Sequence, residues 1–144
     1  MARIAIVEEV DAPAAAVWAL LADFADVSWI PVAKRVEIAG EGIGMTRSIY
    51  GGGDVPAVET LTLLDHDERR LGYTIADIPL PASRFEALVS VTTAETGAAV
   101  RFDVDYDPLG PTDSDADAAR QAVEAVYGMI AGWLADAAAV REQS

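Results

Sequence analysis

The amino-acid sequence predicts one α+β domain over residues 1–144, in which a curved antiparallel sheet of about seven strands wraps around a long C-terminal helix. Three observations carry this prediction. A strand-like segment followed by helical signals opens the chain, a series of short alternating segments fills its middle, and a long amphipathic segment closes it. Because a sheet with one apolar face must cover that face, the long helix is expected to pack across it.

The N-terminal region predicts a first strand and then two short helices. Residues 3–10 (RIAIVEEV) alternate and are rich in β-branched side chains, which is typical of a strand. Pro13 lies in the first turn of a helix expected over residues 14–24 (AAAVWALLADF). A second short helical or irregular piece is expected over residues 25–31 (ADVSWIP), where Pro31 stops it.

The middle of the chain predicts one continuous antiparallel sheet, because short alternating segments there are separated by turns rich in Gly, Pro and Asp. The expected strands are residues 33–40, 45–52, 56–65, 70–77, 83–93 and 99–108.

The C-terminal segment, residues 111–144, predicts the long helix. Thr112 or Ser114 is the candidate N-cap, acidic residues follow in the first turn, and an apolar stripe runs along one face. Gly128 and Gly132 leave a strip without side chains, which either admits a closely packed strand or makes room for a ligand.

Composition narrows the range of functions. A net charge of −14 repels phosphate backbones, so nucleic acid is not expected as a partner. The chain has no cysteine and a single histidine, His66, so neither a zinc site nor a Ser-His-Asp triad is expected. Asp103, Asp105 and Asp107 alternate with apolar residues and belong to a solvent-facing row without the other ligands of a calcium loop. We therefore expect no metal and no cofactor.

The hydropathy pattern gives an expected location. Charges interrupt the N-terminal apolar residues early, and no segment reaches the roughly 18 uncharged apolar residues that a membrane-spanning helix needs. A soluble, cytoplasmic protein without membrane insertion is expected.

Two charged residues, Arg47 and Glu59, occur in otherwise apolar rows of neighbouring strands. The period of two places Arg47 beside Ile49 on one face, and Glu59 beside Leu61. If both point inward, each must pair or bind something, because burying an unpaired ion costs several kcal/mol. Arg47 could neutralise a ligand carboxylate or pair with Glu59, and Glu59 could anchor a ligand hydroxyl or act as a general acid or base. If both point outward, they are ordinary surface residues.

The expected architecture also suggests a cavity. Where a sheet curves around a single helix, side chains near the axis can fail to meet, which leaves space for a ligand. Aromatic residues such as Trp29, Tyr73, Phe85 and Tyr127 could line that space or form plain core.

At this point the chain resembles the helix-grip superfamily called START or SRPBCC, and in particular its polyketide cyclase/dehydrase branch. The resemblance spans essentially the whole chain and is carried by DAPAAAVWALLADFADVSWIP, GIGMTRSIYGGG, VETLTLLDHDERRLGYTI, PLP, and the closing FDVDYDPLG with its helix. The superfamily includes lipid carriers, plant allergens, hormone receptors and aromatase/cyclases, so the fold alone does not select a function.

Residues 44–93 are also similar to the plant abscisic acid receptors. That resemblance implies that Glu59, Tyr73, Ile75 and Phe85 face the cavity. The receptors' gate and latch motifs are absent, because GGGDVPA and IPLPASR stand in their places, so hormone signalling is not implied.

The leading hypothesis is therefore a protein that binds a hydrophobic or aromatic small molecule, lipid-like or polyketide-like, between sheet and helix. The alternatives are a cyclase or dehydratase that uses Glu59 as general acid/base, and a protein-interaction module that could form a homodimer. The candidate ligand-binding residues are Trp29, Arg47, Ile49, Glu59, Tyr73, Ile75, Phe85, Val126, Tyr127 and Ile130.

Overall fold

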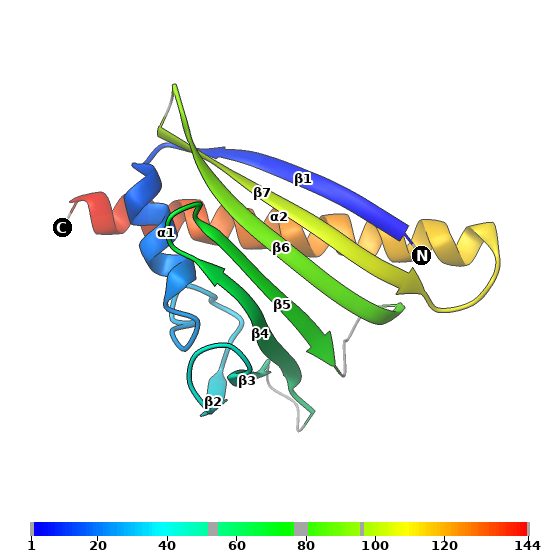
Figure 1. Ribbon diagram of the computed structural model, residues 1–144. Helices are drawn as coiled ribbons and strands as arrows, with labels where there is room; N and C mark the ends of the chain where they lie inside the picture. The colour runs from blue at the N-terminus through cyan, green and yellow to red at the C-terminus, as the bar shows by residue number, and fades with distance from the viewer. Residues whose placement is uncertain (1, 52–54, 77–80, 96, 144) are drawn as a thin grey trace.

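The computed structural model describes residues 2–51, 55–76, 81–95 and 97–143. Over these residues an antiparallel sheet of seven strands, in the order β1-β7-β6-β5-β4-β3-β2, curves around the long helix α2 (Figure 1). The elements are β1 (Ala2–Val10), α1 (Ala14–Ala22), β2 (Arg35–Ala39), β3 (Thr46–Tyr50), β4 (Ala57–Asp65), β5 (Arg70–Ala76), β6 (Ala82–Ala94), β7 (Gly97–Pro108) and α2 (Asp113–Gln143). The predicted fold class is confirmed.

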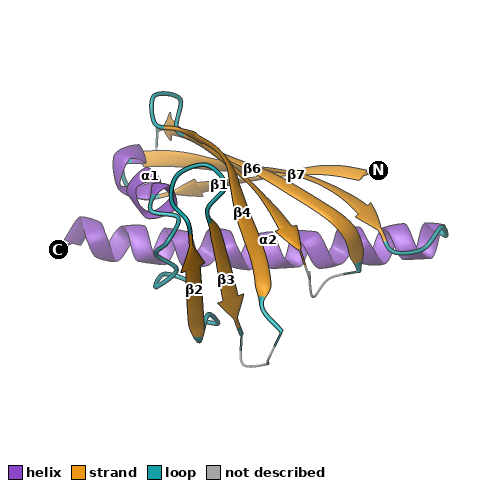
Figure 2. Cartoon of the chain, turned by 60° about the horizontal axis from the view of Figure 1, so that its bottom comes forward, coloured by secondary structure: helices purple, strands orange, loops and turns teal. Residues whose placement is uncertain are grey.

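The helix α2 runs along the inner face of the sheet, and α1 lies beside its C-terminal end (Figure 2). The inner face is apolar because strand residues alternate: Phe102, Val104 and Tyr106 of β7 are each at most 1% exposed. The facing stripe of α2 supplies further core residues at helical spacing, namely Ala119, Val123, Tyr127, Ala131, Leu134 and Ala138.

The start of α2 is capped by Thr112, one of the two predicted residues. The Asp115 amide donates to Thr112 Oγ1 at 3.0 Å, and the Thr112 amide donates to Asp115 Oδ2 at 3.1 Å. This reciprocal arrangement satisfies two amide groups that the helix itself leaves unpaired. The hydrogen bond from the Thr112 side chain lowers the pKa of the Asp115 carboxyl.

The second short helix expected after α1 does not form. Isolated turns replace it, with Asp26 N donating to Asp23 O at 3.0 Å and Ile30 N donating to Val27 O at 2.9 Å. The Asp26 side chain accepts a hydrogen bond from the Ser28 amide, and this contact competes with the backbone hydrogen bonds of a helix. We refer to residues 23–34 as the turn segment, and it carries Trp29 and Ile30 toward the sheet.

Both roles considered for Gly128 and Gly132 are wrong. Each glycine is on the exposed side of α2, and a Cβ atom added to either would meet nothing within 4 Å. Neither residue therefore admits a packed strand or lines the interior.

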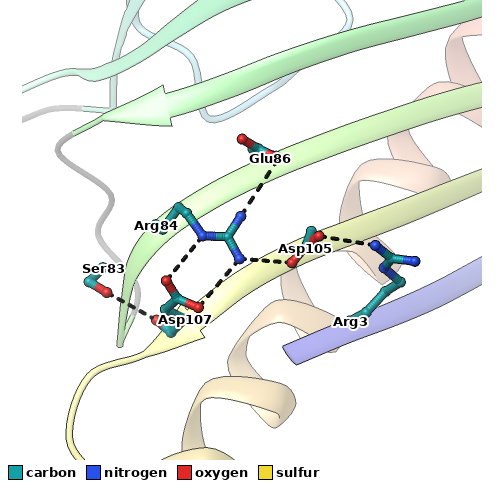
Figure 3. A network of polar contacts seen from close by, with 6 residues as sticks. All are labelled: Arg3, Ser83, Arg84, Glu86, Asp105 and Asp107. Atoms are coloured by element: carbon teal, nitrogen blue, oxygen red, sulfur yellow. Dashed lines mark hydrogen bonds and ion pairs between the residues drawn. The ribbon is translucent and has the colours of Figure 1, made fainter. Parts of the chain in front are cut away.

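The outer face of the sheet carries a network of charges (Figure 3). Arg84 Nε donates to Asp107 Oδ2 at 3.0 Å and Arg84 Nη2 donates to Asp105 Oδ1 at 2.8 Å, while Arg3 also reaches Asp105 at 3.3 Å. The register explains these contacts, because Arg84 is opposite Asp107 and Arg3 is opposite Asp105. The aspartates of this row are thus engaged in ion pairs on the face that the alternation predicted.

This network should make stability depend on acidity. Hydrogen bonds from Arg84 are the main cause that lowers the pKa of both Asp105 and Asp107 from the usual 3.8. Carboxyls with a depressed pKa add stability above their unfolded pKa and lose it as pH falls through the folded pKa. We expect Arg84→Met to lower the urea midpoint at pH 7, and the gap to wild type to shrink as pH drops below about 4.

The matched control is Arg120→Met, because Arg120 is an exposed helix residue with only longer contacts, 3.6 Å to Asp117 and 3.9 Å to Glu124. Its urea midpoint should track wild type at every pH. If the difference in urea midpoint between Arg84→Met and wild type were the same at pH 7 and pH 3, it would contradict a role for the ion pairs of Arg84 with Asp105 and Asp107.

Candidate functional site

Arg47 and Glu59 meet inside the fold. They are directly opposite each other on β3 and β4, and their exposed fractions are 6% and 9%. Arg47 Nε donates to Glu59 Oε1 at 2.7 Å, and Arg47 Nη2 lies 2.6 Å from the same oxygen. The two charges that the sequence places in apolar rows therefore form one buried ion pair.

Phe24 completes the surroundings of the arginine. Its backbone carbonyl accepts a hydrogen bond from Arg47 Nη1 at 2.9 Å, and the guanidinium carbon lies 3.9 Å from the centre of its ring. The face of an aromatic ring attracts a cation that lies over it, so this contact stabilises the guanidinium. The sequence analysis did not propose this role, because it uses a main-chain oxygen and depends on where the chain turns after α1.

Two tyrosines link the sheet to α2. The hydroxyl oxygens of Tyr73 (β5) and Tyr127 (α2) are 2.7 Å apart, and both side chains are buried. Burial is the largest cause that raises the pKa of both phenols above 10. The charge of Glu59 adds to the increase at Tyr73. Both groups therefore remain neutral hydroxyls at physiological pH.

The space beside these groups is much smaller than expected. We call it the central hollow; its volume is about 40 Å³. Ligand pockets usually measure about 300–1,000 Å³, whereas about 30 Å³ is the share of one water molecule in the liquid. The core side chains nearly fill the curve of the sheet, so the expectation of a preformed ligand-sized cavity is not met in this conformation.

The predicted site residues divide into two groups. Those that line the central hollow are Trp29, Arg47, Glu59, Tyr73 and Ile130. Phe85 and Tyr127 are buried without lining it, and their rings stack with centroids 6.0 Å apart. Ile49, Ile75 and Val126 are half-buried and also lie outside the lining.

The sequence analysis missed several lining residues, namely Leu21, Ile30, Leu71, Val89 and Phe102. Four of them had a usable signal. Leu21 is on the apolar face of α1, and Leu71, Val89 and Phe102 share the inward parity of Tyr73, Phe85 and Val104 on their own strands. Ile30 had none, because the turn segment has no regular period.

His66 has a structural partner. The Nε1 group of buried Trp18 donates to His66 Nδ1 at 3.2 Å, and the two rings meet edge to face with centroids 5.7 Å apart. This contact ties α1 to the turn between β4 and β5. It accounts for the histidine without any catalytic role.

A larger concavity, about 500 Å³, opens on the outer face of the sheet. It lies where Gly72 faces the irregularity in β4 between Leu61 and Leu63, and its rim includes Arg3 and Asp105 of the charge network. Those rim charges are already paired with each other. Thr62, Thr74, Glu86 and Asp103 also line this concavity, so its wall is polar, whereas the central hollow borders the buried core.

Two searches of the described residues were negative. No group of three or more His, Cys, Asp or Glu side chains within residues 2–51, 55–76, 81–95 and 97–143 is arranged to hold a metal ion. In the same part of the chain, neither helix combines the length and the apolar character required to cross a bilayer.

Solved structures share this fold. A protein from Bacillus thuringiensis aligns with a TM-score of 0.79 and 20% identity over 94% of this chain and 98% of that one. A protein from Thermobifida fusca aligns with a TM-score of 0.68 and 30% identity over 81% of this chain and 79% of that one. The crystal structure of Ara h 8.0201 aligns with a TM-score of 0.75 and 14% identity over 99% of both chains.

Sequence comparison gives the family. A search of curated proteins found no significant match. Residues 1–139 match the family described as polyketide cyclase / dehydrase and lipid transport. Since this match covers nearly the whole chain and the structural neighbours have the same helix-grip fold, the chain belongs to the polyketide cyclase/dehydrase and lipid transport family.

Proposed function

We propose that this protein binds an apolar or aromatic small molecule between the sheet and α2, at the central hollow. The observation that carries the proposal is the ion pair of Arg47 and Glu59, which lies on the wall of an otherwise apolar interior and beside Tyr73. Polar groups in such a place can orient a ligand, while the surrounding side chains supply apolar contact. Membership of a family described by lipid transport and polyketide chemistry supports the same conclusion.

Binding requires the central hollow to expand, and the structure offers a way. Two of its walls, Trp29 and Ile30, belong to the turn segment and not to a helix or strand. Short turns held by few hydrogen bonds open at lower free-energy cost than packed strands. An outward shift of the turn segment would enlarge the hollow while the sheet stays in place.

Burial of apolar ligand surface can supply enough free energy for binding. A ligand that buries about 300 Å² of apolar surface gains roughly 7 kcal/mol before the costs of association and opening. Micromolar binding of an aromatic compound therefore needs only part of that gain together with one or two well-placed hydrogen bonds.

The test is a screen of aromatic and lipid-like compounds by thermal shift, repeated with Ile130→Trp. Ile130 lines the hollow from α2, so an indole there should fill it and abolish the shift. The control is Met129→Trp, because Met129 is the neighbouring residue and is 52% exposed. No shift with any compound, or an equal shift in both variants, would argue against this site.

Catalysis is the second candidate, and one observation favours it. Glu59 is buried and within hydrogen-bonding distance of a cation, as a general acid or base beside an enolate-binding group would be. It ranks second because Glu59 already binds Arg47 Nε and Nη2, so an enolate oxygen could use only the N–H groups that remain and would lie close to the Glu59 charge. Turnover of a bound polyketide-like compound that disappears in Glu59→Gln while binding persists would establish it.

A further inference from the structure

We propose that the ligand is uncharged and carries a hydroxyl group that donates to Glu59 Oε2. This inference rests on the proposed function and names the ligand class for the same site. It distinguishes an alcohol or phenol from a carboxylic acid, although a buried arginine by itself would suggest an acid.

The first argument is charge. Arg47 and Glu59 neutralise each other at a contact of 2.6 Å, so the polar wall carries no net charge. Among the described residues that line the central hollow, Arg47 is the only cation. A ligand carboxylate would therefore add an uncompensated negative charge to a buried site, in a chain whose net charge is −14. A ligand ammonium would instead add an uncompensated positive charge to the same buried site.

The second argument is the pattern of hydrogen bonds. Both contacts from Arg47 fall on Glu59 Oε1, and Oε2 receives no hydrogen bond from any residue that the structure describes. Since no fully buried side-chain oxygen of the described residues lacks a partner, Oε2 is accessible and not sealed. It is a carboxyl oxygen on the wall of the hollow, where a donor can reach it.

The third argument concerns the arginine. A guanidinium has five N–H donors, and the three contacts of Arg47, two to Glu59 Oε1 and one to the Phe24 carbonyl, leave some of them available. A hydroxyl is both donor and acceptor, so one group can donate to Glu59 Oε2 and accept from Arg47. An ether or ketone can only accept, and it would leave Oε2 without a partner in the closed complex. The Tyr73 hydroxyl is a weaker candidate to bind the ligand hydroxyl, because it is already hydrogen-bonded to the Tyr127 hydroxyl.

The experiment compares three probes with the same ring system: 2-naphthol, 2-methoxynaphthalene and 2-naphthoate. Each is titrated into ¹⁵N-labelled protein, and the amide signals of Arg47, Glu59 and Tyr73 are followed by NMR. We expect 2-naphthol to bind roughly tenfold or more tightly than 2-methoxynaphthalene, which lacks the donor. We expect 2-naphthoate to bind weakest at pH 7.

A reversal in Glu59→Gln provides the specific readout. This variant keeps the shape of the side chain and frees Arg47 from its counter-charge, so 2-naphthoate should bind more tightly than in wild type and 2-naphthol less tightly. A residue that served only to hold the fold would weaken all three probes together. If Glu59→Gln does not fold, Arg47→Met combined with Glu59→Leu replaces it, and that double variant should lose the preference for 2-naphthol over 2-methoxynaphthalene.

The outcomes separate the two proposals. If none of the three probes moves those amide signals in the wild-type protein, the proposed binding site fails, and the ligand class fails with it. If the probes bind but 2-naphthoate or 2-methoxynaphthalene equals or exceeds 2-naphthol, the binding site stands and the hydroxyl assignment is wrong.

Discussion

Replacing Glu59 with alanine is expected to lower the free energy of unfolding by about 3–5 kcal/mol, because Arg47 would keep its charge in a buried position without a counter-charge. Arg47 is only 6% exposed, and its remaining partners are the Phe24 carbonyl and ring. These neutral groups do not replace a carboxylate. The measurement is urea unfolding followed by circular dichroism at pH 7.

Two further variants isolate the cause. Arg47→Met combined with Glu59→Leu removes both charges, and it should be much closer to wild type than the single variant, or more stable than wild type. Glu41→Ala removes an exposed glutamate and should change stability by less than about 0.5 kcal/mol. A Glu59→Ala variant as stable as Glu41→Ala would show that the interior is wetter than the structure indicates.

Gly97→Ala is the second substitution for which we expect a large loss of stability. Gly97 begins β7 with φ +139°, and a Cβ atom there would lie 2.5 Å from Ala12 O and 2.8 Å from both Ala12 N and Val10 O. The unusual backbone conformation alone costs roughly 1–3 kcal/mol for a residue with a side chain. Displacement of the rigid connection between β1 and α1 adds to it, so we expect a clear fall in the urea midpoint.

Gly128→Ala and Gly132→Ala are the matched controls, because they make the same chemical change where the new methyl group meets nothing. Each should raise stability by about 0.5–1 kcal/mol, since glycine is a poor helix former. Opposite signs at Gly97 and at the two helix positions are the expected result of the same thermal or urea measurement. A loss of stability at Gly128 would mean that this face of α2 is covered.

The local pattern of the sequence was sufficient for the strands, their faces and the two helices, but it was wrong in the turn segment, where it predicted a further short helix. The period of two places Arg47 and Glu59 in apolar rows, and both are buried in the structure. An acidic first turn after Thr112, one of the two candidate N-caps, likewise indicates where α2 starts. These features depend on neighbouring residues along the chain, so they are visible before any tertiary contact is known.

Tertiary structure alone decided what those side chains contact and how much space remains. Arg47 is opposite Glu59 because of the register between β3 and β4, and its guanidinium also donates a hydrogen bond to a main-chain oxygen in the turn segment. The central hollow, about 40 Å³, is the small volume that remains after side chains fill the space inside the curved sheet. Such a difference depends on the rotamers and positions of many residues at once, which no periodicity encodes. Gly128 and Gly132 are a different case, because the helical period already places both on the side of α2 opposite buried Val123, where they face solvent.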